Sequence, residues 1–269
     1  APFFITATGI TLQIVYNRSP DSFTRTTLKR GVIIIAMAYL LNLLTPSWFS
    51  LKSWYILHFI GFALLTAPLF ITLKSKYLLW GIAVSLATSA VLLSLFEIPS
   101  ALSNSDMAGT SHDLKSSTSS TALFFRIMLI QGQFSIIPWL TTLFAGVIGG
   151  RLVLRGAVSS TVLYGFSLLI TGIILLGMGI IFENLPIELP LVLSKIFSTS
   201  MLFYPISPAM LLNLSGLSLL FLSIIIRSSR HRKLSETNPI SCAGRLSLTI
   251  LFLHIIIFRE GSHYFNLFR

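Results

Sequence analysis

Two histidines lie inside long apolar runs of this chain, where ionisable side chains are otherwise scarce. His58 follows Trp54 and Tyr55 near the start of one run, and His254 lies near the middle of the last run. An ionisable group at the centre of a membrane helix costs on the order of 2.5–3.5 kcal/mol unless it is paired or hydrated. A neutral imidazole there can act as a general base, or it can simply hydrogen-bond a neighbouring helix. No carboxylate lies in the middle of these runs, which argues against an ion-coupled pump.

Two amides precede a proline and a tryptophan in another run. Gln131 and Gln133 are two positions apart and therefore face different sides of a helix, while Pro138 bends or starts that helix. Trp139 suits the headgroup level of a membrane. One interpretation places the amides in an outward-facing pocket, and the other makes them only the polar start of the helix.

Arginines lie at the ends of two apolar runs. Arg151 and Arg155 close one run, and Arg245 opens the last. The planar guanidinium matches phosphate, but arginines at such positions also bind lipid headgroups and fix topology. Both roles stay open.

Small-residue spacing within two of the apolar runs predicts close helix packing at Gly146, Gly149, Gly150, Gly172, Gly177 and Gly179.

The elements that must position these groups are membrane helices. The chain has 54% hydrophobic and 10% charged residues and a mean hydropathy of +0.86, too little polar surface for a water-soluble globule. The net charge of +11 falls in short clusters between apolar runs, which is the pattern of membrane orientation and argues against nucleic acid. The single cysteine, Cys242, excludes an intrachain disulfide framework and a cysteine-rich metal site.

Spanning the hydrocarbon core takes about 17–25 apolar residues. The sequence accordingly predicts an all-α, polytopic transmembrane bundle of about eight helices, forming a single domain over residues 1–269. Their predicted ranges are about 1–16, 31–49, 53–73, 78–97, 127–150, 157–182, 206–226 and 241–258. Prolines in 184–205 also predict a short interfacial or re-entrant helix.

Charge alternates between successive loops and predicts an orientation. Loops one, three, five and seven hold 12 of the 19 basic residues, which places them in the cytoplasm, including the basic loop 227–240. The polar loop 98–122 then lies outside, as do both ends of the chain. We expect a further helix upstream of Ala1, which would restore a cytoplasmic start.

Five stretches, taken in order, resemble the transmembrane acyltransferase family that includes heparan-α-glucosaminide N-acetyltransferase and its prokaryotic relatives. They are 1–10 (APFFITATGI) with the basic turn 25–31, 56–61 (ILHFIG), 134–151 (beginning FSIIPW), 207–216 and 244–254 (beginning GRLSL). The resemblance spans nearly the whole chain. Each motif is short and hydrophobic, so the match rests on order and spacing.

The resemblance implies that an acyl group, typically acetyl, passes from cytoplasmic acyl-CoA to a glycan amine or hydroxyl on the far side. It implies a catalytic histidine at the outer end of the expected upstream helix, and the family often has Gln where His58 stands. Within this chain the implied roles are an outer acceptor pocket, a mid-membrane passage and a site for the CoA phosphates. The candidate catalytic residues are His58, Gln133 and His254, and the candidate CoA-binding residues are Arg151, Arg245 and Asn213.

No metal is expected, because the sequence supplies no ligand cluster. The expected partners are the lipid bilayer, acyl-CoA and the acceptor, with a homo-oligomer or a membrane complex left open. The expected location is a plasma (inner) membrane or a lysosome-like membrane. Two alternatives stand beside the enzyme: a small-molecule transporter, and a non-catalytic subunit of a larger membrane complex.

Overall fold

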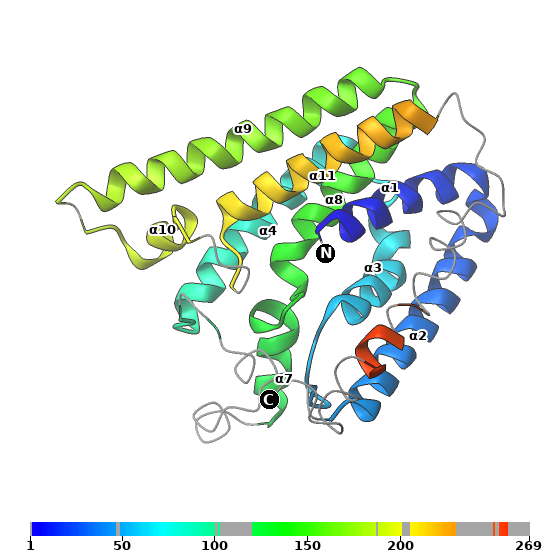
Figure 1. Cartoon of the computed structure of the whole chain (residues 1–269), viewed down its shortest axis with the longest axis horizontal. Coiled ribbons are helices and arrows are strands. Elements are labelled where there is room, and N and C mark those ends of the chain that lie inside the picture. The colour runs from blue at the N-terminus through cyan, green and yellow to red at the C-terminus, as the bar shows by residue number, and fades with distance from the viewer. Residues whose placement is uncertain are drawn as a thin grey trace.

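The regular elements of this protein are helices throughout the part of the chain that the structure describes, which confirms the predicted all-α class (Figure 1). The computed structural model describes residues 2–46, 49–99, 102, 120–186, 188–200, 205–229, 250 and 253–257. The helices are α1 (Pro2–Arg18), α2 (Pro20–Leu44), α3 (Ile56–Phe70), α4 (Ser75–Leu95), α7 (Ser120–Arg126), the π-helical turn η1 (Ile127–Gln131), α8 (Ile136–Leu154), α9 (Val158–Glu183), α10 (Leu191–Ile196) and α11 (Pro208–Ser229).

Five helical stretches in the described chain are long and apolar enough to cross a membrane. They are Pro20–Leu44, Ser75–Leu95, Thr121–Leu154, Val158–Glu183 and Pro208–Ser228, and α3 is a shorter apolar helix. Together with α1, these helices occupy seven of the eight predicted segments. The eighth segment lies largely outside the described residues, as do most of the loops 98–122 and 227–240.

Two predicted helix boundaries differ from those in the structure. The first predicted loop, 17–30, shrinks to Ser19, because Pro20 occupies the first turn of α2 and the charged residues after it continue the helix. The predicted segment 127–150 is divided: α7 and η1 stop at Gln131, and α8 begins at Ile136 with Pro138 in its first turn. The predicted short helix in 184–205 is present as α10.

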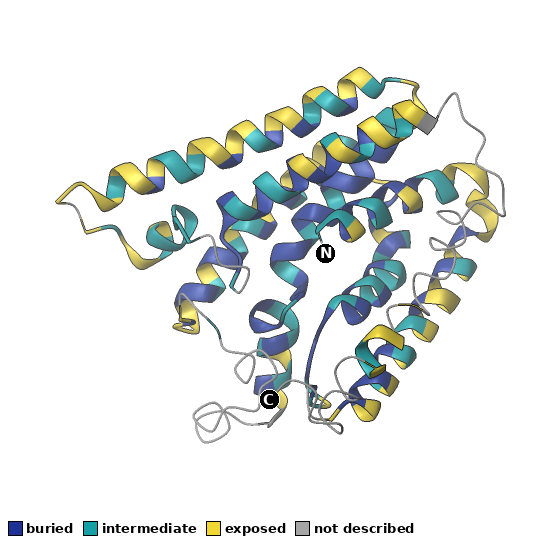
Figure 2. Ribbon diagram, viewed as in Figure 1, coloured by how far each residue is buried: buried dark blue, intermediate teal, exposed yellow. Residues whose placement is uncertain are grey.

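Helix α8 is the centre of the bundle. It packs against α1, α4, α9 and α11, and its residues 145–150 are all buried. By contrast, α9 carries exposed isoleucines, among them Ile170, Ile173 and Ile181, along its outer side (Figure 2). Exposed apolar side chains on this scale suit a lipid solvent. The protein is accordingly an integral membrane protein.

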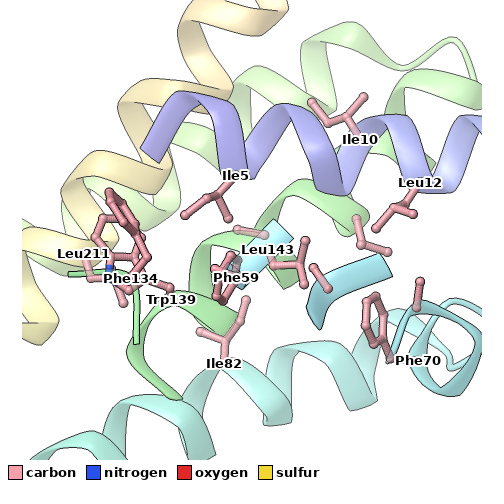
Figure 3. Close-up of a cluster of buried hydrophobic side chains, with 14 of the residues drawn as sticks. Ile5, Ile10, Leu12, Phe59, Phe70, Ile82, Phe134, Trp139, Leu143 and Leu211 are labelled. Atoms are coloured by element: carbon pink, nitrogen blue, oxygen red, sulfur yellow. The ribbon is translucent and has the colours of Figure 1, made fainter. Parts of the chain in front are cut away.

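The helix α1 crosses α8 with backbone against backbone. A methyl group added at Gly9 would overlap the carbonyl oxygen of Leu143, and one added at Gly146 would overlap that of Thr6. Around this crossing Ile5 of α1, Leu143 of α8 and Phe59 of α3 join one buried cluster (Figure 3). The predicted close packing of Gly146 is thus present, whereas Gly177 has no atom within 4 Å of an added methyl group.

The most heavily charged side of the bundle is one set of helix ends, here called the basic end. It comprises the end of α1, the start of α2, the α3–α4 connection, the α8–α9 connection and the end of α11. Its basic side chains include Arg18, Arg25, Lys29, Arg30, Lys74, Lys76, Arg151, Arg155 and Arg227.

We predict that Gly146→Ala destabilises the bundle whereas Gly177→Ala does not. The methyl group at Gly146 forces α1 away from α8, and overpacking of this kind typically costs about 1–3 kcal/mol. At Gly177 there is open space, so the better helix propensity of Ala leaves the melting temperature unchanged or raises it. Thermal unfolding of both variants in the same detergent checks this, and equal melting temperatures would contradict it.

Candidate functional site

Arg151 ties three separate segments together at the basic end. Its Nε donates to Gln13 Oε1 of α1 at 2.9 Å, one terminal nitrogen donates to Ser75 Oγ at 3.2 Å, and the other donates to the Ile71 carbonyl at 2.8 Å. Gln13 reaches this position because α1 lies directly on α8, where Gly150 abuts the Gln13 Cβ. A guanidinium has five N–H donors, so two remain for a ligand.

A cavity of about 510 Å³ opens beside this arginine. Three cations, Lys74, Arg151 and Arg155, are among the described residues that line it, and no carboxylate is. The helix α4 also begins in its wall, at Ser75, so unpaired backbone N–H groups and the positive end of the helix dipole lie nearby. The cavity is therefore suited to a polyanion. Its lining is Gln13, Tyr16, Asn17, Ile71, Thr72, Leu73, Lys74, Ser75, Arg151, Leu154 and Arg155.

His58 lies in the first turn of α3, whereas Arg151 contacts the other end of that helix at Ile71. Its side chain is 0% exposed and is surrounded by the rings of Tyr39, Trp54 and Tyr55, with centroid distances of 4.6, 5.2 and 4.7 Å. The backbone N–H of Tyr55 donates to His58 Nδ1 at 3.4 Å. His58 Nε2 and Trp54 Nε1 are both buried and have no hydrogen-bond partner.

The glutamine motif packs against this aromatic cluster. Gln131 ends the π-helical turn, is 1% exposed and accepts a hydrogen bond from Arg126 Nε at 2.7 Å. A methyl group at Gly132 would lie 3.0 Å from the Trp54 carbonyl oxygen, so the loop touches the segment before α3. Gln133 is partly exposed. The two amides thus differ: Gln131 is a buried structural partner, and Gln133 is the accessible one.

The remaining candidates lie elsewhere. Asn213 of α11 faces α9 and lies against Gly172, with its Oδ1 buried and without a hydrogen-bond partner. It is not part of the cavity lining at Arg151. His254 is exposed within the described helical residues 253–257. Arg245 falls outside the described residues, and His254 is exposed whereas His58 is fully buried.

Sequence reasoning overlooked the partners of the candidates it found. Gln13 is a lone amide in an apolar run, which is the same signal that singled out Gln131 and Gln133. Lys74 was counted only as a loop charge, and Trp54 only as a neighbour of His58. Ser75 carries no sequence signal of its own.

Within the described residues, no group of three or more His, Cys, Asp or Glu side chains could hold a metal ion. The structure has two candidate sites. One is the cationic cavity at the basic end, and the other is the group of buried N–H and amide groups at the start of α3. Residues 58 and 71 are separated by roughly 20 Å along the helix axis, at about 1.5 Å per residue.

No curated protein and no solved structure matches this chain. The family model described as "Heparan-alpha-glucosaminide N-acetyltransferase, catalytic" matches residues 1–164. The match runs from α1 through α8 into α9 and so includes both His58 and Arg151. This chain therefore belongs to the heparan-alpha-glucosaminide N-acetyltransferase catalytic family.

Proposed function

We propose that this membrane acetyltransferase takes its acetyl group from acetyl-CoA at the basic end and delivers it to a glycan amine or hydroxyl at the opposite end. The observation that carries the proposal is the cationic cavity lined by Arg151 at one end of α3, with His58 at the other. The basic end faces the cytoplasm in this proposal, because positively charged loops are retained there.

The cavity at Arg151 fits the phosphates of CoA better than it fits a single lipid phosphate. It combines three cations with the start of α4, and its volume is about 510 Å³. Arginine holds phosphate oxygens through two parallel N–H groups, and Arg151 has two N–H groups left for this purpose. A lipid headgroup would need only one such contact. The nucleotide end of CoA would thus be fixed at the basic end, with its acyl arm directed along the bundle.

Acyl transfer requires little from a protein besides this placement. The acceptor nitrogen or oxygen attacks the thioester carbonyl, the carbon–sulfur bond breaks, and CoA leaves as a thiolate that receives the acceptor proton. Donors that hold the developing oxyanion accelerate the step. His58 and Gln133 stay our candidates at the acceptor end. Roles for Asn213, His254 and Arg245 remain predictions of the sequence.

We predict that Arg151→Gln weakens acetyl-CoA binding by about 10- to 100-fold, since a hydrogen bond to a charged group contributes about 1.5–3 kcal/mol. Binding of acetyl-pantetheine, which lacks the nucleotide phosphates, should not change. Titration calorimetry on the purified protein gives both affinities. Lys74→Gln, which leaves the hydrogen bonds of Arg151 in place, should weaken acetyl-CoA in the same selective way.

The exposed Arg25 of α2 does not line the cavity, so Arg25→Gln serves as the matched control of equal charge change. An equal loss of acetyl-CoA affinity in the Arg25 and Lys74 variants would mean that only net charge matters. An equal loss for acetyl-CoA and acetyl-pantetheine would mean that the cavity does not recognise the phosphates. Either result contradicts the proposed site.

The two glutamines should separate acceptor binding from stability. Gln133→Ala is expected to raise the KM for the acceptor severalfold while leaving the melting temperature unchanged, because Gln133 is accessible. Gln131→Ala leaves Arg126 Nε without its 2.7 Å partner and should lower the melting temperature. Kinetics with glucosamine as the acceptor and thermal unfolding of both variants test this. The reverse assignment of effects would show that Gln131 is the acceptor contact.

A further inference from the structure

Two buried N–H donors beside one another lack an acceptor. Trp54 is 5% exposed and His58 is 0% exposed, and their ring centroids lie 5.2 Å apart with an interplanar angle of 31°. Neither Trp54 Nε1 nor His58 Nε2 has a hydrogen-bond partner. A buried donor without an acceptor destabilises a fold, so two of them on neighbouring rings indicate a ligand.

The hydrogen bond on the other side of the imidazole defines which nitrogen carries the proton. The Tyr55 backbone N–H donates to Nδ1, so Nδ1 must present its lone pair. In the neutral ring the proton is then on Nε2, which makes this nitrogen a donor. In this state His58 presents a hydrogen-bond donor at Nε2.

The segment that carries the pair is held from three sides. Asn42 Nδ2 donates to the Ser53 carbonyl at 3.2 Å, and Tyr55 OH donates to the Ala38 carbonyl at 3.0 Å. On the third side Gly132 abuts the Trp54 backbone, and Arg126 fixes the preceding Gln131. Donors held in place before the substrate arrives are what stabilises a developing negative charge most effectively.

We propose that Trp54 Nε1–H and His58 Nε2–H together form a binding site for the carbonyl oxygen of the acyl group. This inference rests on the proposed function and adds the site of the oxyanion to it. When the acceptor attacks the thioester carbon, the carbonyl oxygen gains the negative charge and the two N–H groups hold it. As the carbon–sulfur bond breaks, the charge leaves on the CoA sulfur, which receives the acceptor proton, and the oxygen becomes a neutral carbonyl again.

The test compares the full-length enzyme and four variants in proteoliposomes, with acetyl-CoA as donor and glucosamine as acceptor. Trp54→Phe keeps an aromatic ring but removes the indole N–H, and should lower kcat on the order of 100-fold with little change in the KM for acetyl-CoA. His58→Gln restores an N–H donor and should retain most of kcat, whereas His58→Leu should lose it. Trp80→Phe, at a side chain 70% exposed on α4, is the control and should behave like the wild type.

The pH profile provides a second readout that a structural role would not change. If His58 acts only as a donor, His58→Gln keeps the pH dependence of kcat; if His58 is a base, this variant loses activity as fully as His58→Leu. Loss of activity in His58→Gln with an unchanged melting temperature, or full kcat in Trp54→Phe, would overturn the donor pair. No transfer by the wild-type enzyme to glucosamine or any other amine or hydroxyl acceptor would overturn the proposed function itself, and the pair with it.

Discussion

Where α1 meets α8, the two helix backbones touch, and the arrangement of the rest of the bundle follows from this contact. Gly9 and Gly146 leave no room for side chains, so the carbonyl groups of each helix approach the other directly. In a membrane the hydrophobic effect does not drive helices together, and close backbone packing supplies much of the attraction. One turn further along, the same approach brings Gln13 onto Arg151. A glycine contact in the apolar core thereby determines the geometry of the cationic cavity.

Two polar sites lie at the two ends of α3. At one end Arg151 bridges α1, α8 and the α3–α4 connection, and its hydrogen bonds leave part of the guanidinium for a ligand. At the other end His58 and Trp54 are buried with unused N–H groups. In the proposed function these two places would serve the donor and the acceptor. The apolar body of α3 lies between them.

Hydropathy and loop charge were sufficient to predict the class of the fold, because membrane helices need long apolar runs and because charge marks their ends. The same signals misplaced the start of α2, since a helix continues into water wherever no residue stops it, and residues 20–30 contain no stop. They also treated η1 and α8 as one helix. The break between them depends on the local hydrogen bonds around Gln131, which composition does not report.

The candidate site was predictable in part. Arg151 stood out because an arginine at the end of an apolar helix suits a phosphate, and it lies in the wall of a cationic cavity. Its partner Gln13 lies 138 positions earlier in the chain, and no local pattern connects the two. Hydropathy gives the position of a residue along a helix but not the direction in which it faces. For this reason the contact between Asn213 and Gly172 of α9 could not be predicted from the sequence.

The central claim, transfer from one end of the bundle to the other, is tested most directly by separating donor and acceptor across a sealed membrane. Vesicles of known orientation would receive acetyl-labelled acetyl-CoA on one side and would hold glucosamine on the other. The account predicts labelled acetylglucosamine only when acetyl-CoA faces the basic end of the protein, whichever way the vesicles are prepared. Transfer that requires both substrates on the same side, or that proceeds equally from either side, would contradict it.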